Sequence, residues 1–220
     1  MTDLNEKEQL ELARSWLRTN GPWIAVGIAI GVSALVGWNW YQQRRETQAQ
    51  TASARYDEAI AAFQRNDNQR GSALVDELNR EYSWTPYAAL GTLLSVRAQV
   101  DANELDKAAA GLKSVMDSAK DEEVRLVARV RLGRVLAAQG KFDEALGVLK
   151  FAEAGVFEPR FADARGDVLL AKGDRDGALK EYLAARAAEE NGRVDSELLD
   201  LKIRDLGGTP PQSPADTEKS

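Results

Sequence analysis

Two stretches of the chain, ARVRLGRVLAAQGKFDEALGVLKFA (residues 128–152) and FADARGDVLLAKGDRDGALKEYLAA (residues 161–185), repeat one pattern. Gly133 and Gly166 occupy equivalent places in the two copies, 33 residues apart. In each copy a second glycine, seven residues further on, is placed to end the first of two helices. A period of this length is typical of solenoids, in which stacked helical repeats bury one continuous core.

These copies resemble the tetratricopeptide repeat (TPR), a helix–turn–helix unit of about 34 residues in which small residues lie where paired helices cross. A looser copy, PYAALGTLLSVRAQVDANELDKAAAGLKSV (residues 86–115), has about five extra residues between its halves. In the last copy Arg165 stands where the repeat usually has Leu. The positions that define the repeat in this chain are Gly91, Ala108, Leu132, Gly133, Ala145, Gly166 and Ala178.

A lone repeat cannot bury its own apolar face, so about three copies and additional capping helices are needed. Residues 46–82 and 193–206 carry apolar side chains at helical spacing and can supply the two caps. The sequence therefore predicts an all-α protein with a TPR-like α-solenoid of about three helix pairs plus capping helices.

A long apolar run, PWIAVGIAIGVSALVGWNWYQQRR (residues 22–45), precedes the repeats. No charge lies between Arg18 and Arg44, so a helix here crosses roughly 30 Å of hydrocarbon. A cleavable leader has a basic start and a shorter core, and a buried core helix is also shorter. We therefore expect one N-terminal transmembrane helix that is retained. Its interfacial aromatic belt comprises Trp23, Trp38, Trp40 and Tyr41.

One face of this span carries small residues. Gly27 and Gly31 are four residues apart, as are Ser33 and Gly37. Small residues at this spacing let a second backbone approach closely, although such spacings also arise by chance in single spans. The sequence leaves open whether this face packs on another transmembrane helix or lies in lipid.

The composition excludes several classes of function. The chain has 220 residues, a formal net charge of −6, and neither Cys nor His. An acidic chain is not expected to bind the phosphate backbone of nucleic acid. The lack of Cys and His removes thiol nucleophiles, thiolate metal ligands and the commonest general base. We expect a protein that is not an enzyme and has no catalytic residue, cofactor or metal site.

The chain is expected to have four parts. Residues 1–21 form a short tail, which Asn20-Gly21-Pro22 separates from the transmembrane helix at residues 22–43, because Gly suits a helix end and Pro suits the start of the next helix. Residues 44–206 form the TPR-like domain. Residues 207–220, GGTPPQSPADTEKS, are rich in Pro, Gly and Ser and are predicted to be disordered.

Beyond the repeats, five stretches are distinctive: Asn20-Gly21, VGWNWYQ (residues 36–42), VDANELDKAAAGL (residues 100–112), ADARGDVLLAKGDRDGA (residues 162–178) and LDLKIRDL (residues 199–206). Through them the chain resembles the YfgM family, the ancillary subunit of the bacterial Sec translocon. The resemblance implies a single-pass inner-membrane protein with a cytoplasmic N-terminus and a helical domain in the periplasm. It also implies two partners, the SecYEG translocon and a PpiD-type periplasmic folding factor, and a part in handling newly exported proteins.

Charge alone does not fix the side of the membrane. The positive-inside rule gives a tie, because three basic residues flank each end of the span. An alternative therefore stays open, in which a single-span regulatory or signalling protein uses its TPR domain to bind a cytosolic or periplasmic regulator. The basic residues are Lys7, Arg14 and Arg18 before the span and Arg44, Arg45 and Arg55 after it.

Repeat geometry places the first helix of each pair on the concave face of a solenoid, where a partner segment can lie. The known TPR clamp for a C-terminal carboxylate needs Lys and Asn on this face, and the pattern is missing here. Each position is also compatible with a solvated side chain of no special role. The candidate groove residues are Thr92, Ser95, Arg134, Asp163 and Asp167.

Overall fold

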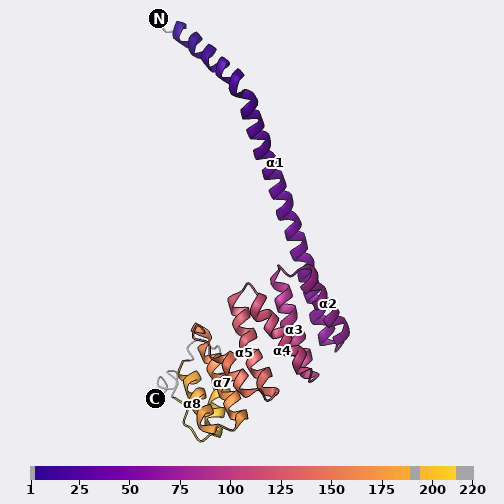
Figure 1. Cartoon of the computed structure of the whole chain (residues 1–220), viewed down its shortest axis with the longest axis vertical. Coiled ribbons are helices and arrows are strands. Elements are labelled where there is room, and N and C mark those ends of the chain that lie inside the picture. Colours follow the sequence, from indigo (N-terminus) through magenta and orange to yellow (C-terminus); the bar gives the residue numbers. More distant parts are fainter. Residues whose placement is uncertain (1–2, 189–193, 212–220) are drawn as a thin grey trace, which may run out of the picture. The chain divides into compact units, whose positions relative to one another are not determined.

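The computed structural model describes residues 3–188 and 194–211, with side chains described from residue 10 onward. Within these ranges the chain is helical and has no strand, which confirms the predicted all-α fold (Figure 1). Residues 212–220 of the predicted disordered tail lie outside the described residues. The elements are α1 (Asp3–Gln64), α2 (Asn68–Glu81), α3 (Pro86–Asp101), α4 (Leu105–Ser118), α5 (Glu122–Ala138), α6 (Phe142–Leu149), the short 3-10 helix η1 (Gly155–Phe157), α7 (Glu158–Lys172), α8 (Arg175–Ala187) and α9 (Ser196–Asp205).

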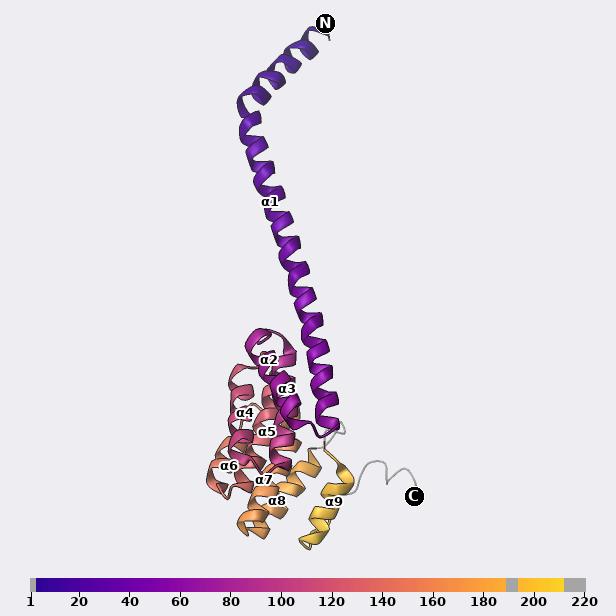
Figure 2. The same cartoon turned by 90° about the vertical axis from the view of Figure 1, so that its right-hand side faces the viewer.

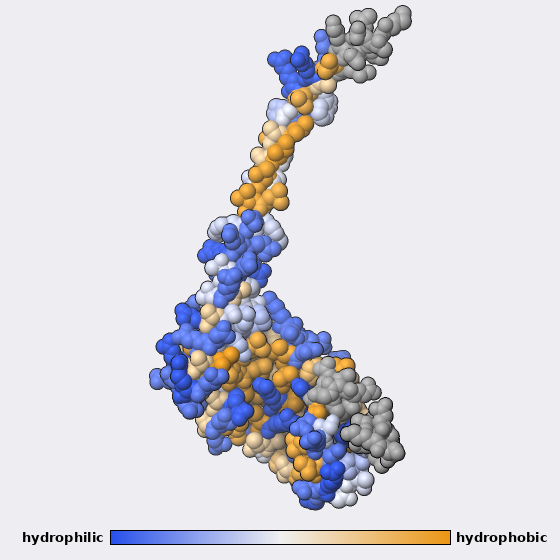
Figure 3. Space-filling model, turned by 180° about the vertical axis from the view of Figure 1, so that it is seen from behind, coloured by the Kyte–Doolittle hydropathy of each residue, from blue (hydrophilic) through white to orange (hydrophobic). Residues whose placement is uncertain are grey.

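The chain divides into two compact units, Met1–Thr51 and Ala52–Ser220. The first unit is the N-terminal part of α1, which contains a segment long and apolar enough to cross a membrane. Figure 3 shows this segment as a hydrophobic band, and Trp23 within it is 78% exposed.

The predicted break at Asn20-Gly21-Pro22 is wrong, because α1 continues through Pro22. Figure 2 shows instead a bend in the indigo, N-terminal part of α1, the part that contains Pro22. Proline lacks an N–H and crowds the preceding turn, so it bends a helix that its neighbours otherwise continue.

The second unit is the predicted solenoid. Helices α3–α4, α5–α6 and α7–α8 form three pairs, and each pair packs on the next. Helices α3, α5 and α7 form an inner row, which lies in Figure 2 between α4 and α6 on one side and α9 on the other. The end of α1 packs with α2 and α3 at one end of the array, and α9 packs on α8 at the other. Both caps were predicted.

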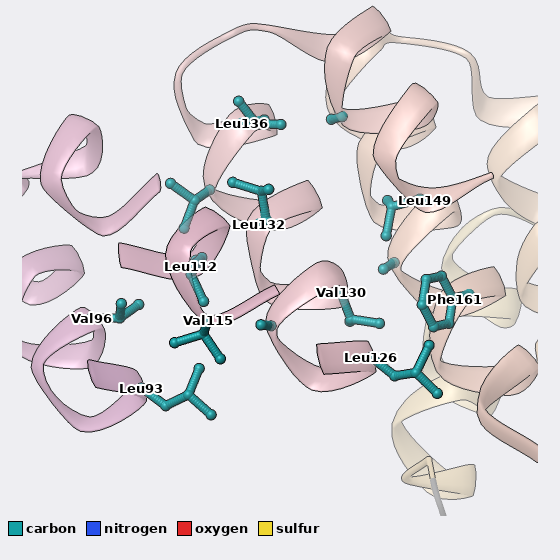
Figure 4. Packing of buried hydrophobic residues seen from close by; sticks show 14 of the residues in the cluster. Leu93, Val96, Leu112, Val115, Leu126, Val130, Leu132, Leu136, Leu149 and Phe161 are labelled. Atoms are coloured by element: carbon teal, nitrogen blue, oxygen red, sulfur yellow. The ribbon is translucent and has the colours of Figure 1, made fainter. Parts of the chain in front are cut away.

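One cluster of buried residues runs from α3 to α7, and Figure 4 shows part of it. Leu112, Leu149 and Phe161 come from different pairs and belong to one cluster of buried residues. A smaller cluster around Tyr182 and Ile203 joins α8 to α9. One core shared between neighbours is what stacked repeats require, because no single pair can bury its own apolar face.

Two of the aligned glycines lie at helix crossings inside their own pairs. A Cβ atom added to Gly133 would lie 2.6 Å from Leu149 Cγ, and one added to Gly166 would collide in the same way with the ring of Tyr182. Both distances are far below van der Waals contact. Glycine is therefore required at these positions by the close approach of α5 to α6 and of α7 to α8.

Gly91, which the sequence aligns with Gly133, lies at a different crossing. A Cβ atom there would lie 3.1 Å from Leu78 in the preceding helix α2. In the α3–α4 pair the close approach comes from Gly111, whose added Cβ would lie 3.2 Å from Val96. The loop between α3 and α4 is as long as the loop between α5 and α6, with left-handed Asn103 in the place of Gly140, so no extra residues lie between the halves of this copy. Counted back from these loops, Val96 and not Gly91 is equivalent to Gly133, and the predicted alignment of Gly91 is wrong.

Candidate partner-binding sites

A hollow lies between α5, α7 and α9, and we call it the groove. It lies on the inner row of helices, on the side where α9 packs. Figure 3 views the molecule from behind, the side on which Figure 2 places α9, and shows apolar surface flanked by hydrophilic atoms on this face. The lining of the groove includes Val127, Val130, Arg131, Arg134, Arg160 and Leu198.

Three of the five predicted groove residues form one ion cluster. Arg134 pairs with Asp163 at 2.6 Å and with Asp167 at 3.3 Å. Lys202 of α9 pairs with the same two carboxylates, at 2.7 Å and 2.5 Å. Two cations therefore face two anions, and the cluster is neutral.

The ion cluster also fastens α9 to the array. Asp163 is buried, and the Tyr182 hydroxyl donates to Asp167 at 2.9 Å. Burial, together with the two nearby carboxylates, raises the pKa of Tyr182, so this hydroxyl stays a donor. Because each of these groups has a partner inside the chain, the main role of the cluster is to stabilise the fold and not to bind a ligand.

The structure does not bring Thr92 and Ser95 to this cluster. Thr92 hydrogen-bonds to Asn79 of α2 at 3.0 Å, and it lines a separate hollow near the N-terminal ends of α3 and α5. Ser95 is buried and accepts a hydrogen bond from Gln99 at 3.1 Å. The corrected alignment of α3 with α5 explains both placements, since Arg97, and not Thr92, is equivalent to Arg134.

Sequence reasoning missed Arg131 and Lys202. Arg131 donates to the Leu93 carbonyl at 3.5 Å. Partial burial, and then repulsion from Arg134 and other nearby guanidinium groups, lowers the pKa of Arg131. The sequence does indicate that Arg131 lies in the groove, because it follows Val127 by one turn and so lies on the same face of the inner helix α5. No local signal marked Lys202, whose role depends on how α9 folds back.

Arg165, which departs from the repeat pattern, is satisfied by ion pairs. Its guanidinium pairs with Glu158 at 2.7 Å and with Glu181 at 2.9 Å, and it donates to the Leu149 carbonyl at 3.3 Å. The side chain is only 14% exposed. A network of three acceptors thus replaces the apolar contact of the usual leucine, and it ties α7 to α6 and α8.

The small-residue face of the span is a second candidate site. A Cβ atom added to Gly27, Gly31 or Gly37 would meet nothing within 4 Å in the described part of the chain. At the end of the span Trp38 and Tyr41 lie in contact, with ring centroids 6.3 Å apart, and Arg44 lies 5.4 Å from the centre of the Trp40 ring. Aromatic rings beside arginine suit a membrane–water interface.

The side chains of residues 10–188 and 194–211 include no group of three or more acidic residues placed to hold a metal ion. The groove offers groups that make non-covalent contacts: apolar side chains, guanidinium groups and one buried carboxylate. These are the residue types of a protein-binding surface.

Comparison with known proteins agrees with this architecture. Residues 14–208 match the family model of the tetratricopeptide repeat-like domain. The chain is 32% identical over 202 residues to a protein of Escherichia coli (strain K12) named ancillary SecYEG translocon subunit, covering 92% of this chain and 97% of that protein. A Neisseria gonorrhoeae protein of the same name is 30% identical over 204 residues, and one of Haemophilus influenzae is 26% identical over 203 residues, each covering 92% of this chain and 98% of its own length.

Proposed function

Because this chain belongs to the YfgM family of ancillary SecYEG translocon subunits, we propose that it is a membrane-anchored TPR scaffold of the bacterial inner membrane. Its single span anchors it beside SecYEG. Its solenoid lies in the periplasm and recruits a PpiD-type folding factor, so that newly exported chains meet that factor as they emerge. The groove supplies contacts and no catalytic chemistry.

One observation carries this proposal. The likeness to the Escherichia coli protein covers nearly the whole of both chains, so it includes the span as well as the repeats. A TPR domain alone would be compatible with many partners. A TPR domain on a span, matched together over this length to translocon subunits, supports association with the translocon.

The assembly is tested by capturing the tagged full-length chain in mild detergent and identifying what co-purifies. We expect the three SecYEG subunits and a PpiD-type folding factor. A chain that lacks residues 52–211 should keep the translocon and lose the folding factor. If neither partner accompanies the intact chain, this function is wrong.

The side of the membrane is tested by a single cysteine, since the chain has none of its own. Ser114→Cys lies at an exposed position of α4, and Ser15→Cys lies at an exposed position before the span. An impermeant maleimide added to spheroplasts should label the first and leave the second unlabelled until lysis. The reverse result would place the solenoid in the cytosol and favour a regulatory protein.

A further inference from the structure

We propose that the groove binds a segment of a partner protein that carries apolar side chains and one acidic side chain, which pairs with Arg131. This inference rests on the proposed scaffold function and adds the chemistry of the segment that the scaffold recognises. The contacts that carry it are the apolar floor of the groove and the cation at its edge.

The charged side chains of the groove differ in the partners that they have within the chain. Arg134 is engaged with Asp163 in the neutral ion cluster. The other acidic residue of the lining, Asp195, accepts from the backbone N–H of Leu198 at the start of α9. Arg131 forms no ion pair with any of the residues in the two described ranges.

Other guanidinium groups lie near Arg131, and this makes it a favourable site for an anion. Arg134, Arg160 and Arg97 all repel it. A carboxylate placed beside Arg131 would relieve this repulsion and gain a charge-assisted hydrogen bond. Arg97 has its own partner in Asp101, and Arg134 is paired within the cluster, so attraction of an acidic segment rests on Arg131 and not on the net charge of the chain, which is −6.

Apolar contacts complete the groove. Val127 and Val130 of α5 line one wall and Leu198 of α9 lines the other, and Leu198 is 49% exposed. Val130 is already buried, so a bound apolar side chain would mainly remove Leu198 and the exposed part of Val127 from water. Arginine beside apolar side chains is also the composition of energetically important centres of protein interfaces. A protein segment fits this combination, and its carboxylate is a side chain, because the Lys and Asn of a terminal-carboxylate clamp are missing.

The test uses the full chain in detergent micelles and fluorescein-labelled peptides with amidated C-termini, followed by anisotropy. The first peptide is Ser-Leu-Val-Glu-Leu-Val-Ser, the second has Lys in place of Glu, and the third has Ser in place of every Leu and Val. We expect the Glu peptide to bind about tenfold more tightly than either of the others. Raising the salt concentration should weaken that preference.

Variants then locate the contact. Arg131→Gln should remove the preference for Glu over Lys, and Arg131→Lys should restore most of it. Lys113→Gln, which removes an exposed cation from the outer helix α4, is the matched control and should leave binding unchanged. Leu198→Ser should weaken the Glu peptide about threefold without changing the melting curve, since the side chain is half-exposed.

Three results would overturn the inference: no binding of the Glu peptide, equal binding of the Glu and Lys peptides, or a preference that survives Arg131→Gln. Binding seen only after the chain is ended at Leu206 would also overturn it, because the occupant would then be the chain's own C-terminal stretch. Any of these results with the translocon still co-purifying leaves the proposed function in place. Loss of co-purification from the wild-type chain removes that function whatever the peptides show.

Discussion

Two glycines of the first unit and two of the second have opposite surroundings. Gly27 and Gly31 in the span have no neighbour within 4 Å of where a Cβ atom would be. Gly133 and Gly166 in the solenoid each face a large side chain from the paired helix, at a distance that admits no Cβ atom. The space beside Gly133 and Gly166 is thus filled by the paired helix, and the space beside Gly27 and Gly31 is not. A partner helix can therefore still pack beside the glycines of the span.

The largest effect is expected inside the solenoid. Gly133→Leu overpacks the crossing of α5 and α6 and should lower the free energy of unfolding by about 3 kcal/mol. Urea unfolding of a fragment of residues 46–206 measures it, and we expect that fragment to be soluble and cooperative. Gly147, on α6, is the matched control, because nothing lies within 4 Å of its added Cβ.

The sign of the change in unfolding free energy should differ between two alanine variants, which makes this comparison sharper. Gly147→Ala should stabilise the fragment by about 0.5–1 kcal/mol, because alanine is the better helix former and the space is open. Gly133→Ala should destabilise it, because even a methyl group collides with Leu149. If both alanines stabilise the fragment, the crossing at Gly133 is not as close as the structure has it.

A smaller effect is expected where α9 joins the array. Lys202→Met removes one cation from the cluster and leaves Asp163, which is only 9% exposed, with Arg134 alone. We expect a loss of about 1–2 kcal/mol of unfolding free energy, less than for a fully buried pair. Lys180→Met changes an exposed cation of α8 and should cost nothing measurable. Equal costs for the two variants would mean that the cluster does not hold α9.

The open glycines should behave in the opposite way. Gly27→Leu with Gly31→Leu should leave the melting curve of the solenoid unchanged and reduce co-purification of the translocon about fivefold, because bulky side chains prevent close packing of two spans. Val26→Leu with Ile30→Leu has the same spacing on a different part of the helix and should retain the partner. If both double variants retain the partner, the small-residue face lies in lipid.

The smallest effect concerns an exposed pair between α6 and α7. The Lys172 ammonium, 2.6 Å from the Asp143 carboxylate, lowers the pKa of Asp143 by hydrogen bonding and by its charge. A lowered carboxyl pKa contributes stability above the unfolded pKa, and this contribution is lost as the pH falls through the folded value. Lys172→Gln should therefore raise the titration midpoint of Asp143 in carboxyl NMR spectra. No change in stability is expected, since Asp143 is 89% exposed.

Sequence reasoning succeeded where the signal was local and periodic. The 33-residue spacing of Gly133 and Gly166 predicted two equivalent crossings, and both exist. It failed for Gly91, because the Leu-Gly pair there resembles the repeat motif but lies in an earlier turn of α3, where it packs on α2. The apolar run predicted the span, but the continuation of α1 through Pro22 depends on how neighbouring turns hold the helix.

The candidate groove was foreseen only in part. Arg134, Asp163 and Asp167 come together because the repeat places them at equivalent turns of adjacent inner helices. Their neutralisation by Lys202 could not be predicted, since Lys202 lies 39 residues beyond Asp163 in a capping helix whose docking is a tertiary event. Arg165 teaches the same lesson, because Glu158 lies two turns away on its own helix but Glu181 of α8 becomes a partner only when the helices pack.

The ion cluster at α9 has a mechanical consequence. Each element of a solenoid is held mainly by its neighbours, so a pulling force applied at one end removes elements in order and does not load the whole array at once. Helix α9 lies at the C-terminal end and touches little beyond α8 and the cluster. In a chain tethered through its span, tension at the C-terminus would therefore peel α9 away first and remove the wall of the groove that Leu198 forms, and Lys202 with its two carboxylates would set the force at which that happens.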